Sequence, residues 1–171
     1  MMKRLLFSNG YGGFDPQSGE YVIRRPDTPR PWVNVISNGK HGMVISQAGG
    51  GYSWREHAQL SRITRWNQNL TSDEAGKFVY LRDDRTGAFW SVTPIPAGET
   101  LRDYECRHGQ GYTVFSGTSN DIASRLTCFV AAKDPLELWI LELRNRSGRE
   151  RNLSVFAYVE WCLGMAPEAA R

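Results

Sequence analysis

The sequence predicts an all-β protein that folds as an antiparallel β-sandwich. Short apolar and aromatic runs are separated by clusters of Gly, Asn, Asp and Pro along all 171 residues. Several of these runs alternate apolar and polar residues with a period of two, which is typical of half-buried strands. No segment carries a sustained apolar stripe with a period of 3.6 residues, so we expect no amphipathic helix.

The predicted strands follow one another between short turns. In chain order they are residues 21–24, 32–36, 43–47, 78–82, 89–92, 122–130, 136–144 and 152–161. Asn38 and Gly39 favour a tight hairpin between the second and third of these strands. The turn at residues 83–87 predicts a second hairpin. In the strand at residues 122–130, Leu126 and Cys128 share one face and Thr127 takes the other.

The last two predicted strands look like a third hairpin, with its turn at residues 145–149. Both strands carry large apolar groups on both faces, as in Leu138, Trp139, Ile140 and Leu141. Such strands are typical of the centre of a layered structure, where both faces are covered. Because they stand at the end of the sequence, we expect a truncated sandwich with further strands missing.

Composition excludes several classes of protein. Hydrophobic residues make up 40% of the chain and charged residues 23%, as is ordinary for a soluble globular domain. The net charge is only +3 and no long basic run occurs, so nucleic-acid binding is not expected. The N-terminus lacks the apolar core of a signal peptide, and no stretch resembles a membrane span. Three scattered cysteines form neither a disulfide framework nor a zinc pattern, so we expect a reduced, cytoplasmic protein.

No catalytic or metal-binding motif is present. His41, His57 and His108 lack partners at ligand spacing. No serine lies in a nucleophile elbow, and nothing in the sequence pairs two carboxylates for acid–base work. We therefore assign no catalytic residue and no metal ligand.

Two stretches carry candidate binding residues. The first follows a run of three glycines and supplies rings that can stack on sugars and guanidinium groups that can grip oxygen atoms; it contains Tyr52, Trp54, Arg55, Arg62, Arg65 and Trp66. The alternative is a glycine-rich turn with both tryptophans in the core and the arginines solvated. The second stretch contains Arg107 and His108, for which the alternative is a strand end with a glycine-rich bend.

An ordered series of motifs then becomes recognisable as a set. Its members include Asn9-Gly10-Tyr11-Gly12-Gly13-Phe14, Pro31-Trp32-Val33-Asn34, Gly50-Gly51-Tyr52-Ser53-Trp54, Arg62-Ile63-Thr64-Arg65-Trp66, Arg107-His108-Gly109 and Tyr158-Val159-Glu160-Trp161-Cys162-Leu163-Gly164. Over residues 7–164 this series resembles the N-terminal β-supersandwich domain of the cellobiose phosphorylase family, glycoside hydrolase family 94, formerly glycosyltransferase family 36.

The resemblance implies a β-supersandwich, then a helical linker and an (α/α)6 catalytic barrel. Residues 1–171 would form the N-terminal part of the supersandwich, and the linker and barrel would be absent from this chain. Members cleave β-glucosidic bonds with inorganic phosphate, invert the anomeric centre and release an α-sugar 1-phosphate. A single Asp of the barrel is the general acid, so no cofactor is implied beyond phosphate as co-substrate.

The resemblance also implies partners for the parent enzyme, namely a β-linked oligosaccharide, phosphate and a second copy in a homodimer. Loops of the N-terminal domain approach the active site, and residues 49–66 are our first candidate for such a loop, ahead of Arg107 and His108. Three alternatives stay open. The chain is a structural domain without ligand contact, a stand-alone carbohydrate-binding module, or the phosphorylase-like part of a cyclic β-1,2-glucan synthase.

Overall fold

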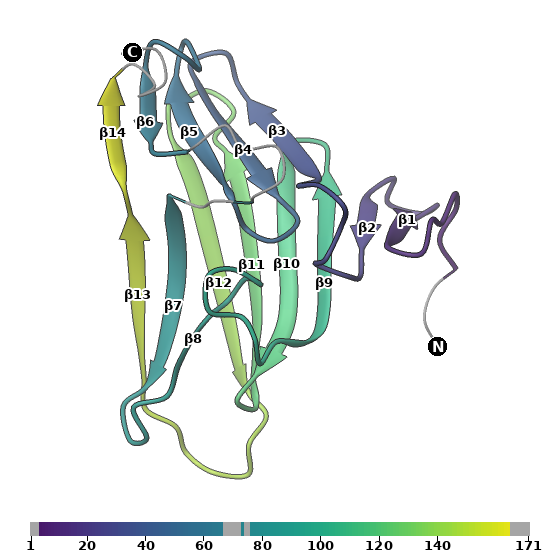
Figure 1. The fold of residues 1–171 in the computed structure, drawn as a ribbon, viewed down its shortest axis with the longest axis vertical. Coiled ribbons are helices and arrows are strands. Elements are labelled where there is room, and N and C mark those ends of the chain that lie inside the picture. Colours follow the sequence, from purple (N-terminus) through teal and green to yellow (C-terminus); the bar gives the residue numbers. More distant parts are fainter. Residues whose placement is uncertain (1–3, 67–72, 74–75, 165–171) are drawn as a thin grey trace.

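The computed structural model describes residues 4–66, 73 and 76–164. Every regular element in these ranges is a β-strand, so the all-β prediction is confirmed (Figure 1). The strands form three antiparallel sheets. Within the described ranges, no helix has the length and apolar character that a membrane crossing requires.

The three sheets differ in size. In spatial order, sheet A contains β1 (Gly12–Phe14), β2 (Tyr21–Ile23), β9 (Arg102–Gly109), β10 (Tyr112–Ser119), β11 (Ile122–Val130) and β12 (Glu137–Asn145). Sheet B contains β14 (Trp161–Gly164), β6 (Arg62–Thr64), β5 (Gly51–Arg55), β4 (His41–Ser46) and β3 (Val33–Ser37). Sheet C contains β13 (Leu153–Val159), β7 (Lys77–Asp83) and β8 (Phe89–Ser91).

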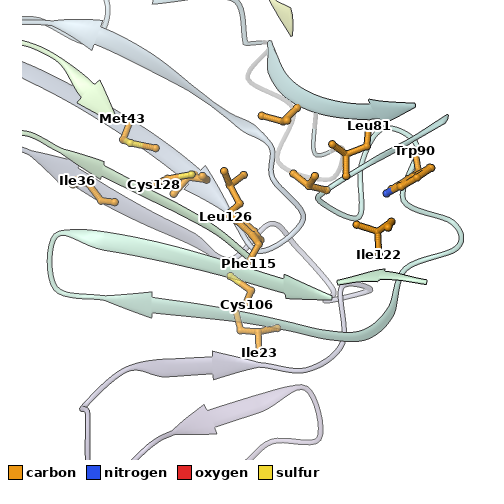
Figure 2. Packing of buried hydrophobic residues seen from close by; sticks show 13 residues of the cluster. Ile23, Ile36, Met43, Leu81, Trp90, Cys106, Phe115, Ile122, Leu126 and Cys128 are labelled. Atoms are coloured by element: carbon orange, nitrogen blue, oxygen red, sulfur yellow. The ribbon is translucent and has the colours of Figure 1, made fainter. Parts of the chain in front are cut away.

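The sheets stack in two layers around one core. Sheet A forms one layer, and sheets B and C lie against it, joined by the continuous run of β13 into β14 (Figure 1). The buried cluster draws Phe115 and Leu126 from sheet A, Met43 from sheet B, and Leu81 and Trp90 from sheet C (Figure 2). Burial of these side chains from all three sheets is the main force that holds the layers together.

Two of the predicted hairpins are confirmed. β3 and β4 pair around Asn38 and Gly39, where Gly39 takes a φ of 85°, a backbone conformation that glycine adopts without strain. β7 and β8 pair across residues 83–87, and the carboxylate of Asp83 accepts the amides of Arg85 and Thr86. Both turns are set by residues close in sequence, which is why they could be predicted.

The third predicted hairpin is wrong. β12 pairs with β11 in sheet A, whereas β13 pairs with β7 in sheet C. The connecting segment crosses between the layers because long-range contacts hold it there. Arg151 donates from Nε to Asp83 Oδ2 at 2.7 Å and from Nη1 to the Asn120 carbonyl at 2.8 Å, with its side chain only 7% exposed.

The prediction that these two strands are covered on both faces is also wrong. β12 and β13 are the end strands of sheets A and C. Ile140 is 50% exposed, and Val155, Phe156 and Tyr158 are about equally open. Their apolar side chains therefore form an uncovered surface of the described chain.

Candidate functional site

The three glycines at residues 49–51 are buried; they follow a turn at Gln47 and Ala48, and Gly51 begins β5. Ser46, Gln47 and Ala48 are at most 5% exposed. A Cβ on Gly49, whose φ is 99°, would lie 2.7 Å from Thr93 Cβ, so the turn packs too closely for a larger residue. The turn closes the β4–β5 pair and thereby sets where the side chains of β5 point.

Strand β5 directs its side chains to two sides of sheet B. Ser53 points into the core and is 2% exposed, whereas Tyr52 and Trp54 lie on the outer face and are half-buried. There they meet Arg62 of β6 and Trp66, which follows it. We call Tyr52, Trp54, Arg62 and Trp66 the aromatic–arginine cluster.

The aromatic–arginine cluster is closely packed. The rings of Tyr52 and Trp66 stack with centroids 4.9 Å apart, and those of Tyr52 and Trp54 are 5.5 Å apart. The guanidinium carbon of Arg62 lies 4.4 Å from the Tyr52 ring centroid and 5.8 Å from that of Trp66. Arg62 also donates to the carbonyls of Ala58 and Trp66, each at 3.3 Å. Because Arg62 is only 7% exposed, it holds the rings in place and does not reach outward.

The neighbouring strand is shaped to receive one of these rings. A Cβ on Gly42, opposite Trp54 in the β4–β5 pair, would lie 2.2 Å from Trp54 Cζ2, so the indole lies directly on the glycine backbone. In the next row, Val35, Val44 and Tyr52 stand opposite one another, and Val35 is 61% exposed. The cluster thus continues into an apolar strip on the outer face of sheet B.

Two further predicted residues stand at the border of the cluster. Arg65 donates from Nη1 to Glu160 Oε1 at 2.5 Å, and its side chain is 50% exposed. Arg55 lies 3.5 Å from Glu56, with 64% of its side chain exposed. Half or more of each arginine side chain is exposed, so part of each guanidinium group can contact a ligand or a neighbouring chain.

Arg107 and His108 lie far from this cluster and point to opposite faces of sheet A. Arg107 is held on the outer face by three carboxylates, donating to Glu20 at 2.8 Å, Asp15 at 3.2 Å and Glu105 at 2.7 Å. Burial works against its charge, but the hydrogen bonds to Glu20 and Glu105 raise the pKa of Arg107 above its usual range. The guanidinium group is therefore fully engaged in fastening β2 to β9.

His108 points inward. Burial lowers the pKa of His108, although the Trp32 carbonyl works in the opposite direction. The distances are 3.0 Å from Nε2 to that carbonyl and 3.0 Å from Nδ1 to the Thr113 hydroxyl. These partners fit a neutral ring that donates from Nε2 and accepts at Nδ1. As the sequence alternative had it, β9 ends here in a bend, with Gly109 opposite Tyr112 at the start of β10.

One polar cluster was not predicted from the sequence. Lys77 Nζ lies 2.5 Å from Glu137 Oε1 and 2.5 Å from Ser53 Oγ, and the Ser53 hydroxyl donates to Glu137 Oε2 at 2.6 Å. His41 Nε2 is 3.1 Å from the same oxygen. We call these four residues the interior charge cluster. It joins sheet B, sheet C and sheet A, and no sequence pattern reveals it because the pairs in direct contact lie 24 to 96 positions apart.

The carboxylate of Glu137 is the charged partner of Lys77. Burial raises the pKa of Glu137, but Lys77 outweighs it and keeps that pKa below its usual range, so the carboxylate is charged. Lys77, Ser53 and His41 contact that carboxylate, and the two pockets that Glu137 helps to line contain no second Asp or Glu among their described residues. Residues 4–66, 73 and 76–164 contain no group of three His, Cys, Asp or Glu side chains that could hold a metal ion.

Comparison with known proteins identifies the family of this chain. Residues 19–171 match the family model described as the glycosyl hydrolase 94 supersandwich domain. An N,N'-diacetylchitobiose phosphorylase of Vibrio furnissii is 42% identical over 153 residues, which cover 88% of this chain and 19% of that protein.

Other relatives carry different activities in their names. A solabiose phosphorylase of Paenibacillus borealis is 36% identical over 90% of this chain and 20% of its own length. A cyclic β-(1,2)-glucan synthase of Rhizobium meliloti is 35% identical over 94% of this chain and 6% of its own length. The chain thus spans a fifth or less of these relatives. Because the family model covers most of its residues, the chain belongs to glycoside hydrolase family 94, within the supersandwich domain.

Proposed function

We propose that this chain is the accessory N-terminal part of an inverting β-glycoside phosphorylase. The reaction would convert a β-linked oligosaccharide and inorganic phosphate into an α-sugar 1-phosphate. Membership in the family supports this proposal, and so do the activities named for the chitobiose and solabiose phosphorylases. The parent enzyme would act as a homodimer in the cytoplasm.

The proposed reaction needs two groups, a phosphate nucleophile and a general acid. Phosphate attacks the anomeric carbon from one side while a carboxylic acid protonates the departing oxygen on the other. Membership in the family leads us to place that acid in another part of the parent protein, in the catalytic barrel. Phosphate enters as a co-substrate, and the proposal needs no resident cofactor.

The aromatic–arginine cluster is the observation that supports a role for this chain near the active site. Half-buried rings on the outer face of sheet B present flat apolar surfaces, on which the C–H faces of sugar rings stack. Arg55 and Arg65 extend from its border and can donate to hydroxyl or phosphate oxygens. In the proposed dimer, this face lines the active-site rim, in part across the subunit interface.

The test is a phosphorolysis assay on the full-length protein that contains this chain. The protein is incubated with phosphate and a panel of β-linked disaccharides, and release of α-sugar 1-phosphate is measured. Trp54→Ala and Arg65→Ala are then compared with Phe89→Ala and Arg85→Ala, which alter exposed residues of the β7–β8 hairpin. We expect KM to rise severalfold in the first pair and to stay at the wild-type value in the second.

The outcomes separate the two parts of the proposal. Unchanged KM values for both sugar and phosphate in Trp54→Ala and Arg65→Ala would remove the rim role and leave a purely structural domain. A full-length protein that releases no sugar 1-phosphate from any β-disaccharide would refute the phosphorylase reaction itself. Sedimentation of the same samples tests the homodimer.

A second function is favoured by one of the relatives. The cyclic β-(1,2)-glucan synthase matches 94% of this chain, although that part is only 6% of the synthase. Under this alternative, the chain lies within a very long polypeptide that makes cyclic β-1,2-glucan. Detection of that glucan as the product, with no phosphorolysis of disaccharides, would establish it.

A further inference from the structure

A groove of about 600 Å³ lies on the outer face of sheet A, far from the aromatic–arginine cluster. Its floor is formed by Ser116 and Thr118 of β10 and Ala123 of β11. These positions alternate with Phe115 and Leu126, which point into the core (Figure 2). The groove therefore lies on the opposite face of the sheet. In Figure 1 it corresponds to the lower ends of β10 and β12.

The groove owes its shape to small side chains and to a β-bulge. Ser116 pairs with Glu105 and Thr118 with Arg102, so β9 has one extra residue at this point. Within the bulge, Asp103 takes a φ of 53°, which is uncommon for a residue other than glycine. A Cβ on Gly117 would lie 2.5 Å from Leu101 Cδ1, so the glycine opposite the bulge leaves room for the Leu101 side chain. Bulges of this kind re-aim side chains and are frequent beside functional sites.

The wall of the groove carries more positive than negative charge. Arg125 and Glu142 face each other at 3.4 Å, and both side chains are more than half exposed, so this pair is loose. Arg144 and Arg146 complete the wall. In the part of the chain that the structure describes, no carboxylate and no carbonyl engages either guanidinium group. The groove is therefore lined by three arginines and by two carboxylates, those of Glu142 and Asp103.

This combination of groups matches a particular kind of ligand. Guanidinium groups bind phosphate and carboxylate through paired hydrogen bonds, whereas carboxylates and hydroxyls of the protein accept from sugar hydroxyls. A volume of about 600 Å³ accommodates one or two sugar rings. We propose that this groove binds an anionic sugar, a hexose unit bearing a phosphate or a carboxylate, with its charge at Arg144 and Arg146 and its hydroxyls along Ser116 and Thr118. The proposal does not depend on the phosphorylase role.

Titration calorimetry on the 171-residue chain tests this inference with four probes. They are α-glucose 1-phosphate, glucuronate, inorganic phosphate and glucose. We expect saturable binding of at least one anionic sugar with a Kd on the order of 1 mM. Binding of the phosphate ester alone identifies a sugar phosphate as the ligand, and tighter binding of glucuronate identifies a uronic acid. Both outcomes support the proposal.

Matched variants locate the binding. Arg144→Gln/Arg146→Gln should weaken binding by about tenfold or more. Arg30→Gln/Arg85→Gln removes the same charge from exposed positions outside the groove and should keep the wild-type affinity. Ser116→Asp places a negative charge on the floor and should also abolish binding. Urea midpoints of all variants verify that they are folded.

Three results would overturn the proposal. The first is the absence of saturable binding by either anionic sugar. The second is equal loss in the groove and control variants, which would indicate a diffuse effect of net charge. The third is equal affinity for inorganic phosphate or for glucose, since the groove would then recognise a bare anion or a neutral sugar.

Discussion

Removal of the Glu137 carboxylate tests the interior charge cluster directly. In wild type this group lies 2.5 Å from Lys77 Nζ, and the lysine side chain is only 7% exposed. Glu137→Ala would leave the ammonium group buried with the Ser53 hydroxyl and the face of the Trp139 ring, whose centroid is 5.1 Å away. Neither neighbour carries the charge that offsets desolvation. Breaking a buried pair in this way costs about 3–5 kcal/mol of unfolding free energy.

The assay is urea unfolding followed by tryptophan fluorescence. For a chain of this size the denaturant slope is about 2 kcal/mol per M, so the midpoint should fall by about 1.5–2.5 M. Glu142→Ala is a matched control on the same strand. Its partner Arg125 is 3.4 Å away and both side chains are exposed, so its cost should stay below about 1 kcal/mol.

A double variant separates the loss of an ion pair from the burial of an unpaired charge. Glu137→Leu/Lys77→Met replaces both charges with apolar groups and should recover most of the stability lost in Glu137→Ala. If Glu137→Ala shifts the midpoint no more than Glu142→Ala does, the conclusion that Lys77 is buried and depends on this carboxylate is refuted.

Three further predictions address titration, packing and reactivity. Backbone amides of the β7–β8 turn, followed by a buried arginine, hold the pKa of Asp83 at about 2, below the value of about 3.9 in an unfolded chain. The stabilisation that the Asp83 carboxylate gives the folded state is therefore complete above the unfolded pKa and is lost as the pH falls through the folded pKa. In Asp83→Asn the urea midpoint should therefore fall less than in wild type between about pH 4 and pH 2. Gly42→Ala should cost about 1–3 kcal/mol and shift tryptophan emission because its Cβ would overlap the Trp54 ring, whereas Gly148→Ala, in open space, should be neutral in both readouts. A thiol reagent should modify Cys162 first in the native chain. Cys106 and Cys128 are buried, and burial raises their pKa values, so they should react only in urea. Equal rates for all three thiols in the native chain would contradict the burial of Cys106 and Cys128.

The candidate site was predictable only in part. Tyr52, Trp54, Arg62 and Trp66 were chosen together from the sequence because they lie within one short stretch, and the structure does bring them together. Their surroundings were not predictable. The sequence alternative placed both tryptophans in the core, whereas the structure places them on the outer face of sheet B, with Arg62 buried beside them. Which face of a strand meets the other layer depends on how the sheets stack.

Arg107 shows the same limit more sharply. In the sequence it is an isolated basic residue beside a histidine, without any visible partner. In the structure its guanidinium group meets Glu20 from 87 positions away and Asp15 from 92 positions away. The Arg144 and Arg146 groove likewise exists only because β10, β11 and β12 lie side by side.

Local features of the chain were enough to predict the all-β class, the hairpins at Asn38-Gly39 and at residues 83–87, and the family. The class and the hairpins depend on turn chemistry and on alternation, which act between residues near one another in the sequence, whereas the family came from the resemblance of an ordered set of motifs. The separation of β12 and β13 into different layers, and the meeting of Lys77 with Glu137, arise at the tertiary level. These features could not be predicted because the sequence of an edge strand is compatible with more than one pairing partner. The choice among partners is made by the burial of whole sheets and by ion pairs that form once distant segments have come together.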